Sequence, residues 1–420
     1  MTRVAGQLET HGSVTRSLRI RNFRLFFGGQ LISQTGTWLT MVAQALFVLH
    51  LTDNSGVAVG LLTACQFLPV LVLGAWAGLV ADRSNKRTLL LIAQSCAMLQ
   101  SFAMAALIAT GDPPLLAIYA VAALGGTITA FDSPARRSFV VEMVPDDHLQ
   151  NAVSLNSALM TGSRIVGPAL AGLLIVTAGY TWCFVIDGVS YIAVLVGLWR
   201  IRTSELRPAP ITTPGKGQVR EGLRYVRGEP DLFVPLVMMT IVGTFAMNFV
   251  VVMPLFVKQS LAGSDTNYTL VYSVMSIGSL GAALLKARLT STTNRQVITG
   301  TAAYGASLLL IASMPNLAWT FPAALVLGAA SVMCTVPATT NVQMRALPSM
   351  RGRVLALQGV VWIGTTPVGA PILGWVCEHL GPRVGLLIGA AACAVAVLWA
   401  MLIAPPMSGE VGATQPIGAA

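Results

Sequence analysis

Long apolar stretches recur along the whole chain and are separated by short polar segments. A helix needs about 20 apolar residues to cross the hydrocarbon core of a bilayer. The pattern therefore predicts an all-α membrane protein with twelve transmembrane helices. The expected spans are residues 25–51, 56–81, 87–110, 113–140, 150–178, 181–201, 231–257, 266–287, 297–314, 317–342, 353–377 and 382–404.

Basic residues give an orientation to these spans. If the amino terminus is inside, the inner segments carry 23 of the 26 Lys and Arg residues, with Arg136 and Arg137 among them. The outer loops carry only Lys258 and Arg383. Because positive charge collects on the cytoplasmic side, we expect both termini in the cytoplasm and the protein in a bacterial plasma (inner) membrane. We expect no cleavable signal peptide, since the start of the chain is polar and basic.

Composition agrees with a lipid environment. Hydrophobic residues make up 55% of the chain and charged residues 10%, whereas soluble domains carry about 25% charged residues. The net charge of +10 comes from loop clusters, so it does not indicate nucleic acid. The sequence has no Walker loop, no Ser-His-Asp arrangement and no metal-spaced His/Cys cluster, and the six cysteines lie in apolar runs. We expect no enzyme, cofactor or metal, and a monomer whose partners are a small-molecule substrate, protons and lipid.

A Pro- and Gly-rich segment divides the spans six and six. We expect a first helical bundle at 1–201, a cytoplasmic linker at 202–230 and a second bundle at 231–420. The two halves share residues at an offset of 203, which indicates duplication: Pro134, Pro145, Pro168 and Gly78 correspond to Pro337, Pro348, Pro371 and Gly281.

The loop after the second span carries a Gly-Asp-Arg-Arg pattern made by Gly78, Asp82, Arg83 and Arg87. This resembles the G-x-x-x-D-R-x-x-x-R signature of the major facilitator superfamily. The resemblance implies two pseudo-symmetric six-helix bundles around a central cavity that opens alternately to either side. It also implies that Asp82 acts in a gate latch. Leu285 stands where the second half would repeat Asp82, so we expect the latch on one side only.

The fifth span is rich in small residues: Gly162, Gly167, Pro168 and Gly172. It is similar to the exporter signature of that helix, G-x-x-x-G-P-x-x-G-G, with a first gap one residue longer. Small residues allow close helix packing in a membrane, so a purely structural role is the alternative. The resemblance favours export over uptake.

Two short stretches, Phe131–Arg137 and Arg351–Val354, resemble the branch that contains siderophore exporters. The resemblance implies a secondary active exporter that moves a small amphipathic molecule, a siderophore-like metabolite or a drug, out of the cytoplasm and is coupled to proton influx. A broad multidrug pump, or a lipid flippase or sensor on the same scaffold, is the alternative. No charge lies between Tyr119 and Ala130, so the arginine that drug–proton antiporters carry there is absent.

Ionisable residues inside spans are costly and therefore candidates for function. Arg164 and Asp187 lie within the fifth and sixth spans. We expect Asp187 to carry a proton, with Glu142 and Asp132 as further candidates, and Arg164 to meet an anionic group of the substrate. A structural charge at a helix–helix interface is the alternative for both Arg164 and Asp187.

Polar residues in the first and seventh spans recur at helical spacing, which predicts one polar face on each helix. Unpartnered amides are unfavourable in hydrocarbon unless they line water. We therefore expect these faces to line the substrate cavity, with polar residues that join helices as the alternative. The predicted cavity residues are Gln30, Gln34, Thr37, Gln44, Thr240, Thr244 and Asn248, with an apolar wall of Trp38, Met41, Phe67 and Met247.

Overall fold

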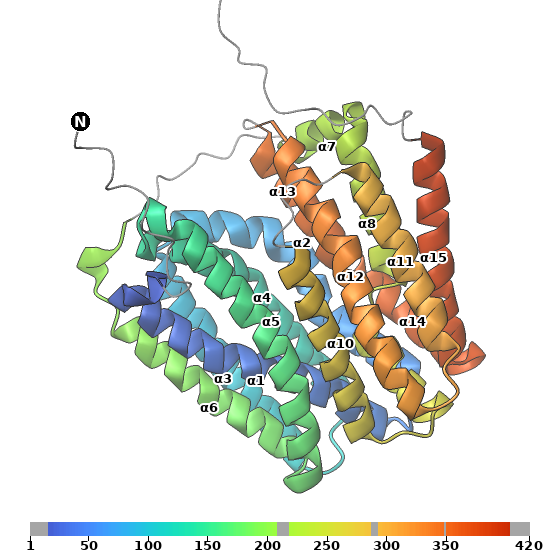
Figure 1. The fold of residues 1–420 in the computed structure, drawn as a ribbon. Coiled ribbons are helices and arrows are strands. Elements are labelled where there is room, and N and C mark those ends of the chain that lie inside the picture. The colour runs from blue at the N-terminus through green and yellow to red at the C-terminus, as the bar shows by residue number, and fades with distance from the viewer. Residues whose placement is uncertain (1–15, 208–217, 287–292, 348–349, 404–420) are drawn as a thin grey trace, which may run out of the picture.

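The computed structural model describes residues 16–207, 218–286, 293–347 and 350–403, and every regular element in these ranges is a helix (Figure 1). The prediction of an all-α protein is confirmed. The first bundle contains six long helices after a short 3₁₀ helix at Arg16–Arg19. They are α1 (Arg21–Leu51), α2 (Gly56–Arg83), α3 (Lys86–Ala109), α4 (Leu115–Met143), α5 (Asp146–Thr177) and α6 (Tyr180–Trp199).

The second bundle contains six further spans, two of which are broken in the middle. One consists of α8 (Pro230–Phe245), α9 (Phe249–Leu255) and a π-helical turn (Phe256–Ser260), and the other of α13 (Arg351–Gly364) and α14 (Thr366–Leu380). The unbroken helices are α10 (Asp265–Lys286), α11 (Asn294–Ala312), α12 (Leu317–Arg345) and α15 (Pro382–Ile403).

Among the described residues, ten helical stretches are long and apolar enough to cross a membrane. The other two expected spans are α1, which carries the glutamine face, and α11, which has 19 residues. Both pack within their bundles, α1 against α5 and α6 and α11 against α12 and α15. The chain is therefore a multi-pass membrane protein.

The break between α8 and α9 has both a local and a tertiary cause. The Asn248 amide donates to the carbonyl oxygens of Thr244 (2.8 Å) and Gly243 (3.4 Å), in competition with the helical ladder. The hydroxyl of Tyr304 donates to the Ala246 carbonyl oxygen at 2.7 Å. These bonds satisfy polar backbone groups that lipid cannot serve.

The segment predicted as a linker contains a helix that was not expected, α7 (Gln218–Gly228). Val226 is 2% exposed and packs in a cluster with Leu232, Leu236 and Val342. The backbone N–H of Leu347 donates to the Tyr225 hydroxyl at 3.3 Å. These contacts attach the end of the linker to the second bundle. The linker prolines 208, 210 and 214 lie outside the described residues.

The two ends of the molecule differ in how the bundles meet. We call them the Ser55 end, where α1 and α14 finish and α2 starts, and the Asp82 end, where α2 finishes and α13 starts. Four of the five hydrogen bonds between described residues of the two bundles lie at the Ser55 end, and the fifth joins Ser273 to the Ile165 carbonyl. In Figure 1, α5 and α10 run side by side between the bundles. At the described part of the Asp82 end, no hydrogen bond or ion pair joins the bundles.

Candidate functional site

A cavity of about 400 Å³ lies within the first bundle and is lined by residues of all six of its helices. None of its lining residues belongs to the second bundle, although the sequence predicted a cavity shared by both. Several predicted residues line it: Gln34, Thr37, Trp38, Met41, Gln44, Phe67, Asp132 and Asp187. The polar face of α1 therefore points into the first bundle's cavity.

Other polar residues of the cavity were missed by the sequence analysis: Thr40, Gln66, Gln94, Gln100, Ser101, Arg136 and Tyr191. Gln94 and Ser101 lie seven residues apart on α3, which places them on one helix face. That spacing is the signal that identifies them. The Gln66 amide donates to Gln44 Oε1 at 2.9 Å, so polar side chains of neighbouring helices partner one another across the cavity wall.

Asp187 on α6 is buried, with 3% of its surface exposed. Its Oδ2 accepts from the Ser101 hydroxyl at 2.8 Å, with the Thr40 hydroxyl at 3.5 Å. Its Oδ1 is buried and has no hydrogen-bond partner among the described residues. Gly36 of α1 brings the two helices close at this point, because a Cβ there would lie 3.0 Å from Ser190 Oγ. The result is a carboxyl group on the cavity wall in which Oδ2 accepts hydrogen bonds and Oδ1 accepts none from the described residues.

Asp132 and Arg136 form an ion pair on α4, with Arg136 Nη2 3.1 Å from Asp132 Oδ2. Arg136 also donates to Gln30 Oε1 (3.3 Å), and the Gln94 amide donates to Asp132 Oδ1 (2.7 Å). Gln30 supports this network and does not line the cavity itself. Arg136 lies within α4, which continues to Met143, and its side chain lines the cavity.

Glu142 lies away from the cavity, near the end of α4. Lys86 Nζ lies 2.8 Å from its Oε1, and both side chains are 9% exposed. The Glu142 carbonyl accepts from the backbone N–H of Arg207 at 2.9 Å. Glu142 thus joins α3, α4 and the start of the linker.

Arg164 on α5 lies over the Trp38 ring, with Cζ 5.8 Å from the ring centroid. Its Nε is buried and has no partner, and among the described residues it forms no ion pair. An arginine over the face of tryptophan gains a cation–π attraction. The guanidinium therefore lies beside a cavity-lining ring without a carboxylate to neutralise it.

The small residues of α5 make two close helix contacts. A Cβ at Gly167 would lie 2.6 Å from Trp38 Cβ, and one at Gly172 would lie 3.0 Å from Thr269 Cβ of α10. Gly162 has open space around it. Pro168 is inside the helix and buried. The motif thus packs α5 on both bundles through two of its three glycines.

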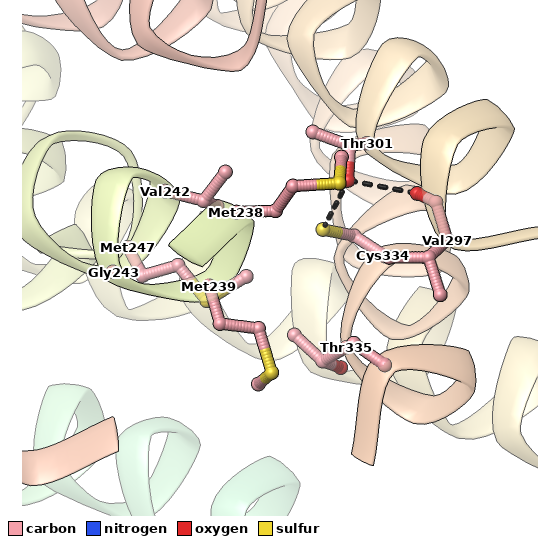
Figure 2. A pocket seen from close by; sticks show the side chains of 10 residues that line it. Met238, Met239, Val242, Gly243, Met247, Val297, Thr301, Cys334 and Thr335 are labelled. Atoms are coloured by element: carbon pink, nitrogen blue, oxygen red, sulfur yellow. Dashed lines mark hydrogen bonds between the residues drawn. The ribbon is translucent and has the colours of Figure 1, made fainter. Parts of the chain in front are cut away.

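The polar residues predicted on the seventh span bond mainly to their own helix. The Thr240 hydroxyl donates to the Leu236 carbonyl and that of Thr244 to the Thr240 carbonyl. Neither these residues nor Asn248 line the cavity of the first bundle. Figure 2 shows the neighbouring pocket of the second bundle, which has about 10 Å³ of free space. It is lined mainly by apolar side chains, including Met238, Met239 and Met247.

The residues of the predicted gate motif are placed at the Asp82 end. Asp82 and Arg83 are exposed and form no hydrogen bond or ion pair within the described parts of the chain. Arg87 donates to the carbonyl oxygens of Leu198 (2.7 Å) and Trp199 (2.9 Å) at the end of α6. A Cβ at Gly78 would meet nothing within 4 Å, so no neighbouring helix approaches α2 closely at this glycine.

Within the described ranges, no three His, Cys, Asp or Glu side chains are grouped as metal ligands require. The site is therefore a set of amides, hydroxyls, aromatic rings and three charged groups, Asp132, Arg136 and Asp187. Such a lining can bind and release a ligand, and it presents a carboxyl group that can take up a cation.

A family model described as transmembrane secretion effector (MFS_3) matches residues 13–415. The chain belongs to this family. This family places the chain in the major facilitator superfamily. The chain is 29% identical over 177 residues to the staphyloferrin A transporter of Staphylococcus aureus, a match that covers 42% of this chain and 44% of that protein. It is 22% identical over 365 residues to the enterobactin exporter EntS of Shigella flexneri, with 86% of each covered.

The fold of the chain agrees with this family. A bacterial homologue of the human lysosomal transporter Spinster, solved in an inward-facing and occupied conformation, superposes with a TM-score of 0.70. The two chains are 15% identical, and the alignment covers 93% of this chain and 97% of that structure. This likeness establishes the shared fold of two six-helix bundles.

Proposed function

We propose that this transporter is a secondary active exporter that moves a small amphipathic molecule out of the cytoplasm by alternating access, driven by proton influx. One observation carries the proposal, the buried carboxyl group of Asp187 on the cavity wall with its bare Oδ1. An ionised side chain inside a membrane protein is costly without compensation. A proton on Oδ1 removes that charge, so the protonated and deprotonated forms favour different arrangements of α1 and α6.

Asp187 suits this role better than the other two predicted carboxylates. Asp132 is neutralised by Arg136, and Glu142 by Lys86. A proton on either group would have to break an existing buried ion pair, which is strongly unfavourable. We therefore assign proton coupling to Asp187 and structural roles in the first bundle to the two pairs.

The excess of basic residues in the inner segments supports an orientation with the Asp82 end on the cytoplasmic side of a bacterial inner membrane. The hydrogen bonds that join the bundles at the Ser55 end support an inward-open state in this orientation. We propose the division into bundles at 1–201 and 231–420, with the linker at 202–230 between them, and a monomeric transport unit.

The cavity lining indicates the kind of cargo. Amides and hydroxyls face it beside Trp38, Met41 and Phe67, which suits a molecule with polar and apolar parts. Arg164, beside Trp38 and without an ion pair among the described residues, favours an anionic group on that molecule. The names of the two relatives support a siderophore-like metabolite. A broad multidrug pump is the second candidate, because methionine and aromatic side chains adapt to ligands of different shapes.

The test uses purified transporter in liposomes with an imposed pH gradient. We expect wild type to concentrate a transported substrate against its gradient and Asp187→Asn to lose that concentration while retaining exchange at equal pH. Asp53→Asn, an exposed carboxylate in the loop after α1, is the matched control. Concentrative transport by Asp187→Asn would contradict the coupling role. Comparison of the medium of a deletion strain and its complement identifies the cargo, and competition by many unrelated dyes favours the multidrug pump.

A further inference from the structure

α2 and the broken helix α13–α14 run antiparallel and pack directly on each other. A Cβ at Gly60 would lie 2.7 Å from the Ala370 carbonyl oxygen and 2.8 Å from Pro371 Cα. Gly56 and Gly374 are equally close, each facing the carbonyl of the other. Since no side chain separates the two backbones there, a small tilt of one helix moves the other's end directly.

A carboxylate lies at the Ser55 end of this helix pair. Glu378 of α14 accepts two hydrogen bonds from the start of α2, from Ser55 Oγ at 2.6 Å and from the Val57 backbone N–H at 2.9 Å. The first N–H groups of a helix have no partner within the helix and carry partial positive charge. Glu378 therefore caps a helix of the other bundle with a full negative charge.

A second carboxylate lies at the opposite end of the same pair. Asp82 is in the last turn of α2, and α13 begins at Arg351 at the same end of the molecule. Asp82 is exposed and forms no hydrogen bond or ion pair in the described part of the chain. Each helix thus has a carboxylate near its carboxyl terminus, beside the amino terminus of its antiparallel partner, and only the Glu378 end is engaged in this state.

We infer that Glu378 is an exterior latch that holds the Ser55 end closed, and that it alternates with Asp82 at the other end of the same helix pair. When the bundles rock, the Glu378 bonds to α2 break as the end of α2 that carries Asp82 approaches α13. The inference rests on the alternating access proposed above. It assigns to Glu378 a role that the motif around Asp82 does not include, since Glu378 lies outside that motif.

The Glu378 latch is tested by measuring distances between spin labels, an experiment that needs neither a known substrate nor transport. In a chain with its six cysteines replaced, one pair of labels is placed at the Ser55 end, on Asp112 and Ser313, which are both exposed. A second pair, on the exposed Ser204 and Met344, reports on the Asp82 end. Pulsed electron–electron double resonance measures the distance between the two labels of a pair. The distance distributions then give the populations of open and closed molecules at each end.

We expect Glu378→Ala to raise the ratio of open to closed molecules at the Ser55 end about tenfold, because hydrogen bonds to a charged group are lost. Glu378→Gln retains an acceptor and should give a smaller shift. Asp53 is a nearby exposed carboxylate that forms no hydrogen bond among the described residues. Asp53→Asn should therefore leave the ratio of open to closed molecules unchanged. Asp82→Asn should shift the ratio in the opposite direction, and the Glu378→Ala/Asp82→Asn double variant should return towards wild type.

Two results overturn the inference and are distinguishable. If wild type populates two states at each end and Glu378→Ala behaves like Asp53→Asn, the latch is wrong while alternating access stands. If wild type keeps a single distance at both ends in every pH condition and Glu378→Ala does not change it, the proposed alternating access fails together with the latch.

Discussion

Gly36 of α1 and Asp187 of α6 are in contact across the interface of their helices, with no room for a methyl group between them. A Cβ on Gly36 would overlap Asp187 Oδ1 and lie 3.3 Å from Asp187 Cα. The hydrogen of Gly36 thus sets how closely α1 approaches the buried carboxyl group. The contact connects helix packing to the position of the group that we assign to proton coupling.

Gly36→Ala should therefore destabilise the transporter by about 1–3 kcal/mol, the usual cost of overpacking, and reduce pH-driven transport. Gly28→Ala on the same helix is the matched control, because a Cβ there meets nothing within 4 Å. Thermal unfolding in detergent measures the first effect and initial transport rates in liposomes the second. Equal behaviour of the two variants would show that α1 moves away from Asp187 without cost.

Features that follow from the bilayer itself could be predicted from the sequence, whereas features that depend on tertiary contacts could not. The twelve spans follow from the need for apolar length across a bilayer, and their positions are confirmed to within a few residues. The break after Phe245 and the helix α7 depend on tertiary partners such as Tyr304 and Val342. No periodicity in the sequence records those partners.

Only part of the cavity lining could be predicted, because some of its residues are brought together by tertiary packing alone. The α1 face was recognised because its polar residues recur at helical spacing. Arg136 was missed because only the packing of α4 against its neighbours brings it to the cavity wall. Gln94 shares a helix face with Ser101 and could have been identified from that spacing. Thr240 and Thr244 have the expected spacing, but their hydroxyls bond to their own backbone. Spacing alone does not distinguish a polar residue that lines a cavity from one that bonds to its own helix backbone.

Arg87 belongs to the predicted gate motif, but its contacts in this state are structural. Its guanidinium caps the carbonyl oxygens of Leu198 and Trp199 at the end of α6, where a cation is favourable. Arg87→Gln should lower the free energy of unfolding by about 1–2 kcal/mol. Arg83→Gln, at an exposed position in the same motif, should lower it by less than about 0.5 kcal/mol. Thermal unfolding compares them, and equal losses would contradict the capping role.

Arg164 should select for negative charge on the substrate. Arg164→Gln removes the cation beside Trp38, and we expect about tenfold slower transport of an anionic hydroxycarboxylate siderophore, since bonds to charged groups are worth about 1.5–3 kcal/mol. Transport of a cationic dye such as ethidium should not slow. Arg164→Lys keeps the charge and should retain most of the anion transport. Parallel initial rates in liposomes give the ratio, and an equal decrease for both probes would show that Arg164 only packs helices.

Arg136 and Asp132 should behave as a unit, because each neutralises the other in the cavity wall. Arg136→Gln leaves the Asp132 carboxylate buried without its cation, which should cost about 3–5 kcal/mol of stability. The double variant Asp132→Asn/Arg136→Gln removes both charges and should recover most of that loss. Unfolding of the four proteins in detergent forms a double-mutant cycle, which isolates the pairwise energy. A double variant as unstable as Arg136→Gln alone would show that Gln30, the other acceptor of Arg136, and not the ion pair, accounts for the effect. Recovery of stability without recovery of transport would instead show that the pair also contacts the cargo, since both side chains line the cavity.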